Sequence, residues 1–281
     1  MKYKISHDTQ YTFSTPVFPE PHYLRLRPQV TPHQRVDAFA LHISPTPTGI
    51  SHLRDGENNL IDFCWFDGEH NHLRIRAESL VTIAEHNPFH FILYPDTALT
   101  LPFSYTDQQR KVLHTALLAA PIGADLLAYG QRLLAAAHFQ TTNFLTQITR
   151  EIQADFTSIY RETGPPLPPD QTFTDRVGSC RDLSWMLIHL LRTMGLAARF
   201  VSGYNYIDAD DPEFELHAWV EVFLPGAGWV GFDPTHGLVA GMSHIPLVAS
   251  ADFENTMPVS GTIRGSARST LTSTLVIERL G

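Results

Sequence analysis

The chain has 281 residues, which is long enough for one large domain or two ordinary ones. Its 43% apolar and 17% charged residues are typical of a globular protein rather than a disordered one. Lys and Arg number 20 against 29 Asp and Glu, for a net charge of -9, and no stretch clusters cations. Because phosphate binding needs such clusters, the composition argues against a nucleic-acid partner.

The N-terminal stretch MKYKISHDTQYTF alternates polar and apolar residues and lacks the apolar segment of a signal peptide. The most apolar stretch, Val112 to Phe139, is interrupted by proline, glycine and charged residues, so we expect no membrane span and no membrane partner. With no export signal, the two cysteines, Cys64 and Cys180, are not expected to form a disulfide. A cytoplasmic location is therefore expected.

The first hundred residues have the pattern of β structure. Residues 5–13 and 73–83 alternate apolar and polar side chains with a period of two, as half-buried strands require. Asp55-Gly56 and Asp67-Gly68 are hairpin-type turn signals on either side of a strand-like run, Leu60 to Phe66. Strands between such turns predict a small sandwich or barrel.

The pattern then changes to helix. Three runs are rich in Leu, Ala, Gln and Arg and poor in β-branched residues: 107–119, 124–138 and 142–156. The proline-rich link that follows, residues 164–169, is expected to prevent a helix and to extend as polyproline. The strongest helical pattern covers 183–194, and Gly195 stands where a C-terminal cap belongs.

Strand-like runs come after this helix, at 197–204, 216–224 and 229–233. Pro225-Gly226-Ala227-Gly228 joins the last two runs as a hairpin signal. A loop-rich stretch is expected to about Gly261, followed by a final alternating strand at 271–277.

Cys180 begins the best-patterned helix, directly after Gly178-Ser179. Unpaired backbone N–H groups at a helix N-terminus favour negative charge, so a cysteine there can hold its thiolate near neutral pH. The thiolate is the nucleophile of acyl transfer, and the same amides can stabilise an oxyanion. The alternative is that Cys180 is a small buried hydrophobic residue, and its position alone leaves both interpretations open.

His217 opens one strand of the hairpin, and Asp233 ends the other. A base and its orienting carboxylate are held more rigidly on neighbouring strands than on loops. An even-numbered loop would place Asp233 on the face of Val220, so a shared face with His217 requires an odd connection with a glycine bulge. The two backbones would then lie about 7–8 Å apart. The alternative is that His217 is one of fifteen ordinary histidines and that Asp233-Pro234 starts a turn.

The chain also resembles a known family, the bacterial transglutaminase-like proteins, often described as candidate cysteine proteases. Two stretches resemble their core: GSCRDLSWMLIHLLRTMGLAARFVSGY and LHAWVEVFLPGAGWVGFDPTHG. The segment YKISHDTQYTFSTPVFPEPHYLRLRP resembles the β domain that precedes this core, and HIPLVASADFENTMPVSG resembles the tail. The resemblance covers nearly the whole chain, least closely between about residues 85 and 140. One departure is Ser250-Ala251-Asp252-Phe253, where many relatives carry a Gly-Arg-Asp-Tyr-like sequence.

The resemblance implies a papain-like core with Cys180 as nucleophile, His217 as base and Asp233 as its orienting partner. We therefore predict an α+β protein in which the Cys180 helix packs on an antiparallel sheet. Its three parts are an N-terminal β-sandwich-like domain, a helical connection and a transglutaminase-like core with the C-terminal strand, at residues 1–100, 101–165 and 166–281.

The expected function is cysteine-dependent acyl transfer on a peptide or protein amide through a thioester. The same three residues serve a peptidase or amidase, where water is the acceptor, and a transglutaminase, where an amine is. Hydrolysis or peptide-type amide exchange on a small peptide is favoured over protein crosslinking. The alternative from another class is a non-catalytic binding or scaffolding module with a vestigial triad, and the long β domain supports it.

Other residues invite weaker interpretations. Cys64 lies in an alternating run and is expected to pack. His236 is the alternative base, but a turn histidine is favoured because His217 sits on the better-supported element. Asp182 suits a helix N-terminus, and a structural role is expected. The second oxyanion donor stays open among Trp185, Tyr160 and Gln171.

Two parts of the sequence invite a metal interpretation. The acidic run from Asp208 to Glu215 invites a calcium interpretation, because animal relatives of the core use that ion. It lacks the frame of a calcium loop, so a solvated loop that attracts a cationic substrate is favoured. Zinc held by Cys180, His217 and Asp233 is disfavoured, since a cysteine at a helix start suits nucleophilic work. No metal and no cofactor are expected.

Overall fold

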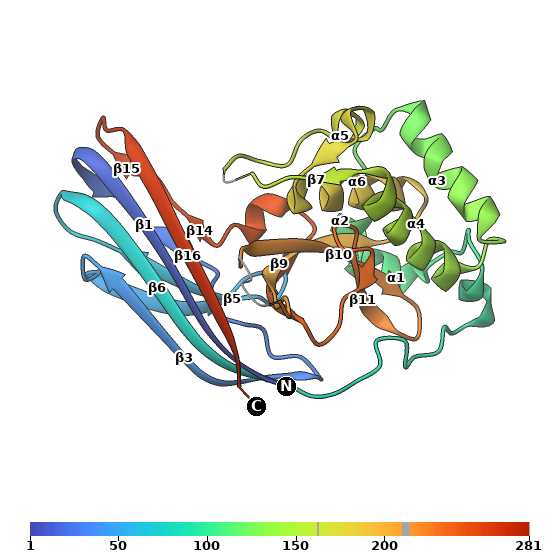
Figure 1. The fold of residues 1–281 in the computed structure, drawn as a ribbon, viewed down its shortest axis with the longest axis horizontal. Helices are drawn as coiled ribbons and strands as arrows, with labels where there is room; N and C mark the ends of the chain where they lie inside the picture. The colour runs from blue at the N-terminus through green and yellow to red at the C-terminus, as the bar shows by residue number, and fades with distance from the viewer. Residues whose placement is uncertain (162, 210–213, 281) are drawn as a thin grey trace.

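The computed structural model describes residues 1–161, 163–209 and 214–280. Long antiparallel strands form a β domain on one side, and helices packed on a second sheet form a core beside it (Figure 1). The chain is an α+β protein, as predicted.

The β domain consists of two antiparallel sheets. One contains β1 (Lys2–Pro19), β3 (Gln34–Ser44), β6 (His70–Ile83), β15 (Ile263–Arg264) and β16 (Ser269–Leu280). The other contains β2 (His22–Leu24), β4 (Gly49–Arg54), β5 (Leu60–Trp65) and β14 (Val259–Ser260). The predicted period of two is confirmed, since every second residue from Leu73 to Ile83 on β6 is buried.

The two sheets share one hydrophobic cluster, which makes the domain a sandwich. Phe13 and Ile75 of the first sheet belong to it together with Leu24 and Cys64 of the second. Cys64 is 0% exposed, and burial raises the pKa of its thiol to about 11. The expectation that Cys64 packs is confirmed.

The two turn signals of this domain behave differently. Asp55-Gly56 lies between β4 and β5. These strands pair antiparallel, with Arg54 opposite Leu60 next to the turn, so this hairpin is confirmed. Asp67-Gly68 joins β5 to β6, and these strands belong to different sheets. The second hairpin prediction is wrong, because the same turn chemistry serves any sharp change of direction.

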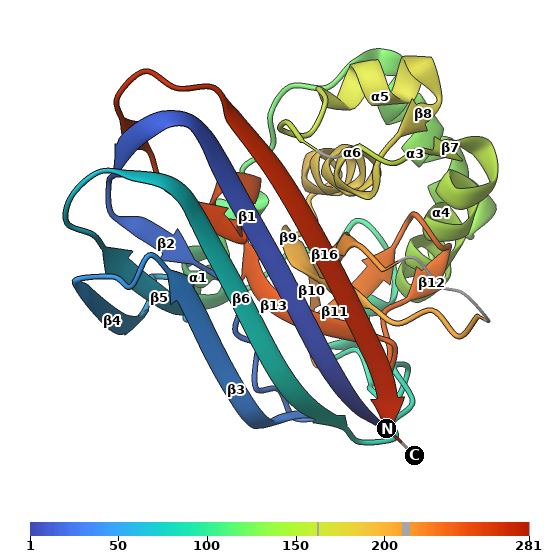
Figure 2. The same cartoon turned by 60° about the vertical axis from the view of Figure 1, so that its left-hand side comes forward.

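The last strand belongs to the β domain although it follows the core in the chain. β16 pairs antiparallel with β1 over twelve positions, from Lys2 opposite Leu280 to Phe13 opposite Ser269. The two ends of the chain consequently lie side by side (Figure 2). The division at residues 1–100, 101–165 and 166–281 remains a prediction about sequence segments, and strand pairing crosses it.

The predicted helical connection contains α1 (Asp107–Val112), α2 (His114–Leu117), α3 (Ala124–Ala136) and α4 (Thr141–Asp155), and η1 (Asp96–Leu99) precedes it. The helix expected at 107–119 is thus broken at Leu113. The proline-rich link stays irregular to Pro168, but Pro169 starts α5 (Pro169–Asp175), a helix that the prediction missed because proline suits a first helical position. Among the described residues, the structure has no helix long and apolar enough to cross a membrane.

The core is built around α6 (Cys180–Thr193), which follows the short parallel pair β7 (Thr157–Ser158) and β8 (Val177–Gly178). Its sheet contains β9 (Ala198–Asn205), β10 (Leu216–Leu224), β11 (Gly228–Asp233), β12 (Leu238–Val239) and β13 (His244–Ser250), in the order β12-β11-β10-β9-β13. α6 packs against β9 and β10, as predicted, and Met186, Leu187 and Leu190 on it are 0% exposed.

β13 lies where a loop was expected. It forms the edge of the core sheet beside β9, and its pairing shifts register between Pro246 and Val248. A proline within a strand-like run is compatible with an edge strand and a bulge but hides the strand in the sequence. η2 (Phe253–Thr256) follows it.

The β domain is fixed to the core at β13. Asn59 pairs with the backbone of Ala249, donating from Nδ2 to its oxygen at 2.9 Å and accepting its N–H at 3.0 Å. One hydrophobic cluster contains Tyr3 and Ile5 of β1 together with Tyr204 of β9. The relative position of the two parts is therefore set by a shared core and by directed hydrogen bonds.

Candidate active site

Cys180 occupies the first position of α6, and the start of this helix is held by a buried carboxylate. Asp182 accepts hydrogen bonds from the backbone N–H and the hydroxyl of Ser179, at 2.7 and 2.8 Å. Its other oxygen accepts from Nη1 of Arg161 at 2.5 Å and from the N–H of Leu167 at 2.7 Å. Burial alone would raise the pKa of Asp182, but these donors lower it. The structural role predicted for Asp182 is confirmed.

The β10–β11 hairpin meets the geometric condition set by the sequence. Leu224 pairs with Gly228 and Val220 with Phe232, so the connection has three residues, an odd number. Gly226 and Gly228 have φ of 90° and 79°, a conformation that glycine adopts without strain. This register places Asp233 on the face of His217, as predicted.

The three predicted site residues lie together. His217 Nε2 is 2.7 Å from Asp233 Oδ2, and Cys180 lines the same cavity as His217. Burial lowers the pKa of His217, but the Asp233 carboxylate and the Cys180 sulfur outweigh it and raise that pKa to about 10. The His217 imidazolium is therefore the favoured form at neutral pH.

The His217–Asp233 pair should make stability fall at high pH. Because the pKa of His217 is higher in the folded protein than in the unfolded chain, protonation of His217 stabilises the fold. This contribution is complete below the unfolded pKa of about 6.5 and is lost as pH rises through about 10. Between about pH 8 and about pH 10 the loss should reach about 2 kcal/mol, measured by urea unfolding. The matched variant His217→Gln should lack this component, and parallel pH curves for the two proteins would contradict the assignment.

Asp233 is the centre of a larger hydrogen-bond network. It is 0% exposed, and its Oδ2 lies 2.8 Å from His236 Nδ1 and 3.0 Å from His244 Nε2 in addition to His217. Oδ1 accepts the N–H groups of Thr235 at 2.9 Å and of His236 at 3.3 Å. Burial raises the pKa of Asp233, but these partners, His217 first, hold it well below the usual range.

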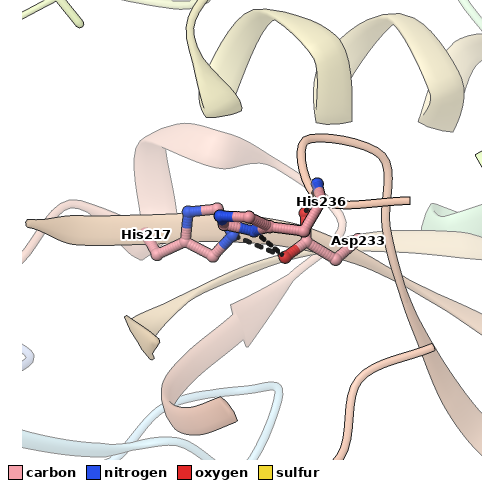
Figure 3. A group of neighbouring side chains, drawn as sticks. All are labelled: His217, Asp233 and His236. Carbon is pink, nitrogen blue, oxygen red and sulfur yellow. Dashed lines mark hydrogen bonds and ion pairs between the residues drawn. The ribbon is translucent and has the colours of Figure 1, made fainter. Parts of the chain in front are cut away.

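His236 lies in the turn, as expected, but it is also part of the site. Figure 3 shows His217 and His236 both pointing to the same oxygen of Asp233. The turn position of His236 is confirmed, and its hydrogen bond to Asp233 is a feature that the sequence did not predict. The signal was its distance of three residues from Asp233, which lets a turn bring its side chain back onto the carboxylate.

His244 is a residue that the sequence analysis missed. It lies on β13 and is 5% exposed, and its Nδ1 accepts the N–H of Gly241 at 3.3 Å. Nε2 therefore carries the proton and donates to Asp233. Burial lowers the pKa of His244, so this histidine is a neutral donor that orients the carboxylate.

These side chains open into a cavity of about 450 Å³. Cys180, His217 and His236 line it, together with parts of the β domain. Among the three proposed oxyanion donors, Tyr160 lines the cavity, whereas Trp185 and Gln171 do not. In the segment that departs from the family pattern, Phe253 is a lining residue.

A metal could in principle use three of these residues. His217, Asp233 and His236 offer ligand atoms within 4.8 Å of one another, and this set contains His236 in place of Cys180 of the disfavoured zinc set. The two nitrogens lie 2.7 and 2.8 Å from the carboxylate oxygen, closer than the separation of about 3.3 Å between two ligands of one tetrahedral zinc. The two histidines and Asp233 are therefore arranged as hydrogen-bond partners rather than as ligands around one metal ion.

The acidic run is described in part. Residues 210–213 lie outside the described residues, so the calcium interpretation cannot be placed there. Asp208 pairs with Arg279 at 3.3 Å, and Glu215 lines the cavity.

Two family models match the chain. The model described as the bacterial transglutaminase-like N-terminal region matches residues 3–82, and the one described as the transglutaminase-like superfamily matches residues 129–234. The second match covers both Cys180 and His217 and ends directly after Asp233.

Three relatives show how far the likeness extends. An uncharacterised protein of Mycobacterium tuberculosis is 27% identical over 280 residues, which cover 93% of this chain and 87% of the relative. The protein-glutamine gamma-glutamyltransferase of Pseudomonas aeruginosa is 35% identical over 83 residues, or 26% of this chain and 12% of that protein. The crystal structure of a candidate cysteine protease from Cytophaga hutchinsonii has a TM-score of 0.71 at 20% identity, covering 100% of this chain and 92% of that one. With the N-terminal region and the core both matched, the predicted resemblance to the bacterial transglutaminase-like proteins is confirmed.

Proposed function

We propose that the protein is a cysteine-dependent acyltransferase or hydrolase acting on a peptide or protein amide. The observation that carries the proposal is that His217, hydrogen-bonded to Asp233, lines the same cavity as Cys180 at the start of α6. A cysteine paired with a histidine, which is in turn oriented by a third group, is the arrangement that activates a thiol nucleophile.

In the first step the Cys180 thiolate attacks the carbonyl carbon of the amide. The tetrahedral oxyanion lies near the backbone N–H groups that begin α6, which can donate to it. The carbon–nitrogen bond then breaks as His217 gives its Nδ1 proton to the leaving amine. A thioester on Cys180 and a neutral His217 remain.

In the second step His217 Nδ1 removes a proton from water or from an amine, which attacks the thioester carbonyl. The carbon–sulfur bond breaks, the Cys180 thiolate is regenerated, and His217 is again an imidazolium. Water gives hydrolysis and an amine gives a new amide. We favour hydrolysis or amide exchange on a small peptide, and the cavity of about 450 Å³ suits a ligand of that size.

The likeness to the gamma-glutamyltransferase over the core supports testing glutamine amides as donors. A cytoplasmic location is part of the same proposal. Both cysteines are free thiols, which a reducing compartment preserves.

The second candidate is a binding or scaffolding module in which the triad is vestigial. It is favoured by the β domain, whose strands contribute to the same cavity without supplying any of the three triad residues. A vestigial site would leave an ordinary thiol, so the reactivity of Cys180 separates the two candidates.

Iodoacetamide labelling over a range of pH tests the proposal. Wild-type protein should label at one site quickly below about pH 7, because the proposed mechanism requires a reactive thiolate beside the His217 imidazolium. Labelling should vanish in Cys180→Ala and slow about tenfold or more in His217→Ala. Labelling that rises only near about pH 8.5 and ignores His217 would favour the binding module.

Amide chemistry is then measured with benzyloxycarbonyl-glutaminyl-glycine as donor, with and without hydroxylamine. Hydroxamate formation indicates transfer to an amine, and ammonia release without hydroxylamine indicates hydrolysis. Cys64→Ala is the matched control, since Cys64 is buried in the β domain and should leave both reactions unchanged.

A further inference from the structure

One wall of the catalytic cavity comes from the β domain. β16 lies on the side of its sheet toward the core in both ribbon views (Figure 1 and Figure 2). Three cross-strand pairs of β1 and β16 line the cavity: His7 with Leu275, Thr9 with Ser273, and Tyr11 with Leu271. Because side chains alternate along a strand, these pairs form one continuous surface opposite Cys180.

The middle of this wall is polar, and its polar groups are held in place. His7 is 4% exposed, and its Nδ1 lies 3.1 Å from the hydroxyl of Tyr204 on β9. Its Nε2 lies 3.1 Å from Ser273 Oγ and 3.3 Å from Thr9 Oγ1. When Tyr204 donates to Nδ1, Nε2–H donates to the two hydroxyl oxygens. Ser273 and Thr9 then keep their own protons for an acceptor in the cavity.

The wall is also uncharged. Burial lowers the pKa of His7 to about 4, so its imidazole is neutral at physiological pH. The other side chains of the three pairs are apolar or carry hydroxyl groups. The charged side chains among the described lining residues come from the core: Arg161, Arg181, Glu215 and the His217 imidazolium. A chain bound along the wall would thus meet hydroxyl donors between apolar patches, which suits an uncharged peptide.

We propose that the β domain forms part of the substrate site, and that Thr9 and Ser273 donate hydrogen bonds to the main-chain carbonyls of an uncharged peptide segment next to the reacting amide. His7 is a positioning residue that orients both hydroxyls. This inference rests on the proposed function, because it assigns a substrate-binding surface to the same cavity.

Two alkylating probes separate binding from thiol reactivity. Iodoacetamide is too small to reach the wall, whereas benzyloxycarbonyl-leucyl-alanyl chloromethyl ketone carries an uncharged dipeptide. In the Thr9→Val/Ser273→Ala variant, the half-saturating concentration of the dipeptide probe should rise about tenfold, with the iodoacetamide rate unchanged. Ser273→Trp, which fills the groove from an exposed position, should have a larger effect on the dipeptide probe alone.

Thr272→Ala is the matched control, since this exposed residue points to the opposite face of β16 and should behave as wild type. If both Ser273 variants label with the dipeptide probe as wild type does, the inference is overturned while the proposed function stands. If neither probe labels Cys180 of wild type below about pH 7, the proposed function fails and the inference fails with it.

Discussion

Replacing Asp233 by asparagine should lower acyl transfer by about 10⁴-fold, the loss that a comparable change causes in a serine-histidine-aspartate site. The physical reason is that an amide cannot replace this carboxylate in either orientation. Oδ2 faces nitrogens of His217, His236 and His244, and Oδ1 faces two backbone N–H groups. Whichever way the asparagine amide turns, its NH₂ group meets donors, so one side of the network loses its acceptor.

The same change should destabilise the fold by about 3 kcal/mol, because buried donors lose a charged partner. Hydroxamate formation measures the first effect and urea unfolding near neutral pH the second. Asp175→Asn is the matched control, since Asp175 is exposed on α5 and distant from the network in the chain. An Asp233→Asn protein with activity within tenfold of wild type would show that His217 needs no carboxylate.

Gly203→Ala should cost about 3 kcal/mol of stability and reduce activity with it. Gly203 lies on β9, opposite His217 of β10 on one side and Pro246 of β13 on the other. A Cβ atom at this position would stand 2.4 Å from the carbonyl oxygen of Ile245 and 2.6 Å from Cη2 of Trp219. Backbone must move to relieve the first contact, so β13 would shift away from β9.

That shift would carry His244 away from Asp233, which links the stability loss to the site. Urea unfolding and the iodoacetamide rate below about pH 7 measure the two effects. Gly241→Ala is the matched control. A Cβ atom added at Gly241 would have the carbonyl oxygen of Val239 as its nearest neighbour, at 3.9 Å, and would therefore fit without a clash. Equal stability of the two variants would mean that β13 tolerates displacement.

The parts of the site that could be predicted depend on local signals. Cys180 stands out because a helix pattern begins there, and the glycines of the β10–β11 turn restrict the register that brings His217 and Asp233 to one face. In each case the relevant residues are close in the sequence or joined by one tight turn, so periodicity and turn chemistry carry the information.

The parts that were missed depend on contacts between distant segments. His244 reaches Asp233 because β13 pairs with β9, and Pro246 conceals that strand. His7 was placed correctly in an alternating strand, but its neighbour Ser273 lies 266 residues away in the sequence. A pattern within one strand shows which side chains share a face and leaves open what that face meets.

The pairing of β16 with β1 also sets an order of events during synthesis. The segment that carries Cys180, His217 and Asp233 leaves the ribosome before β16 does, since the chain emerges from its N-terminus. Until β16 has been made, β1 has a bare hydrogen-bonding edge beside an unfinished groove. The nascent protein therefore contains Cys180 before β16 has completed the wall that we propose as its peptide-binding surface.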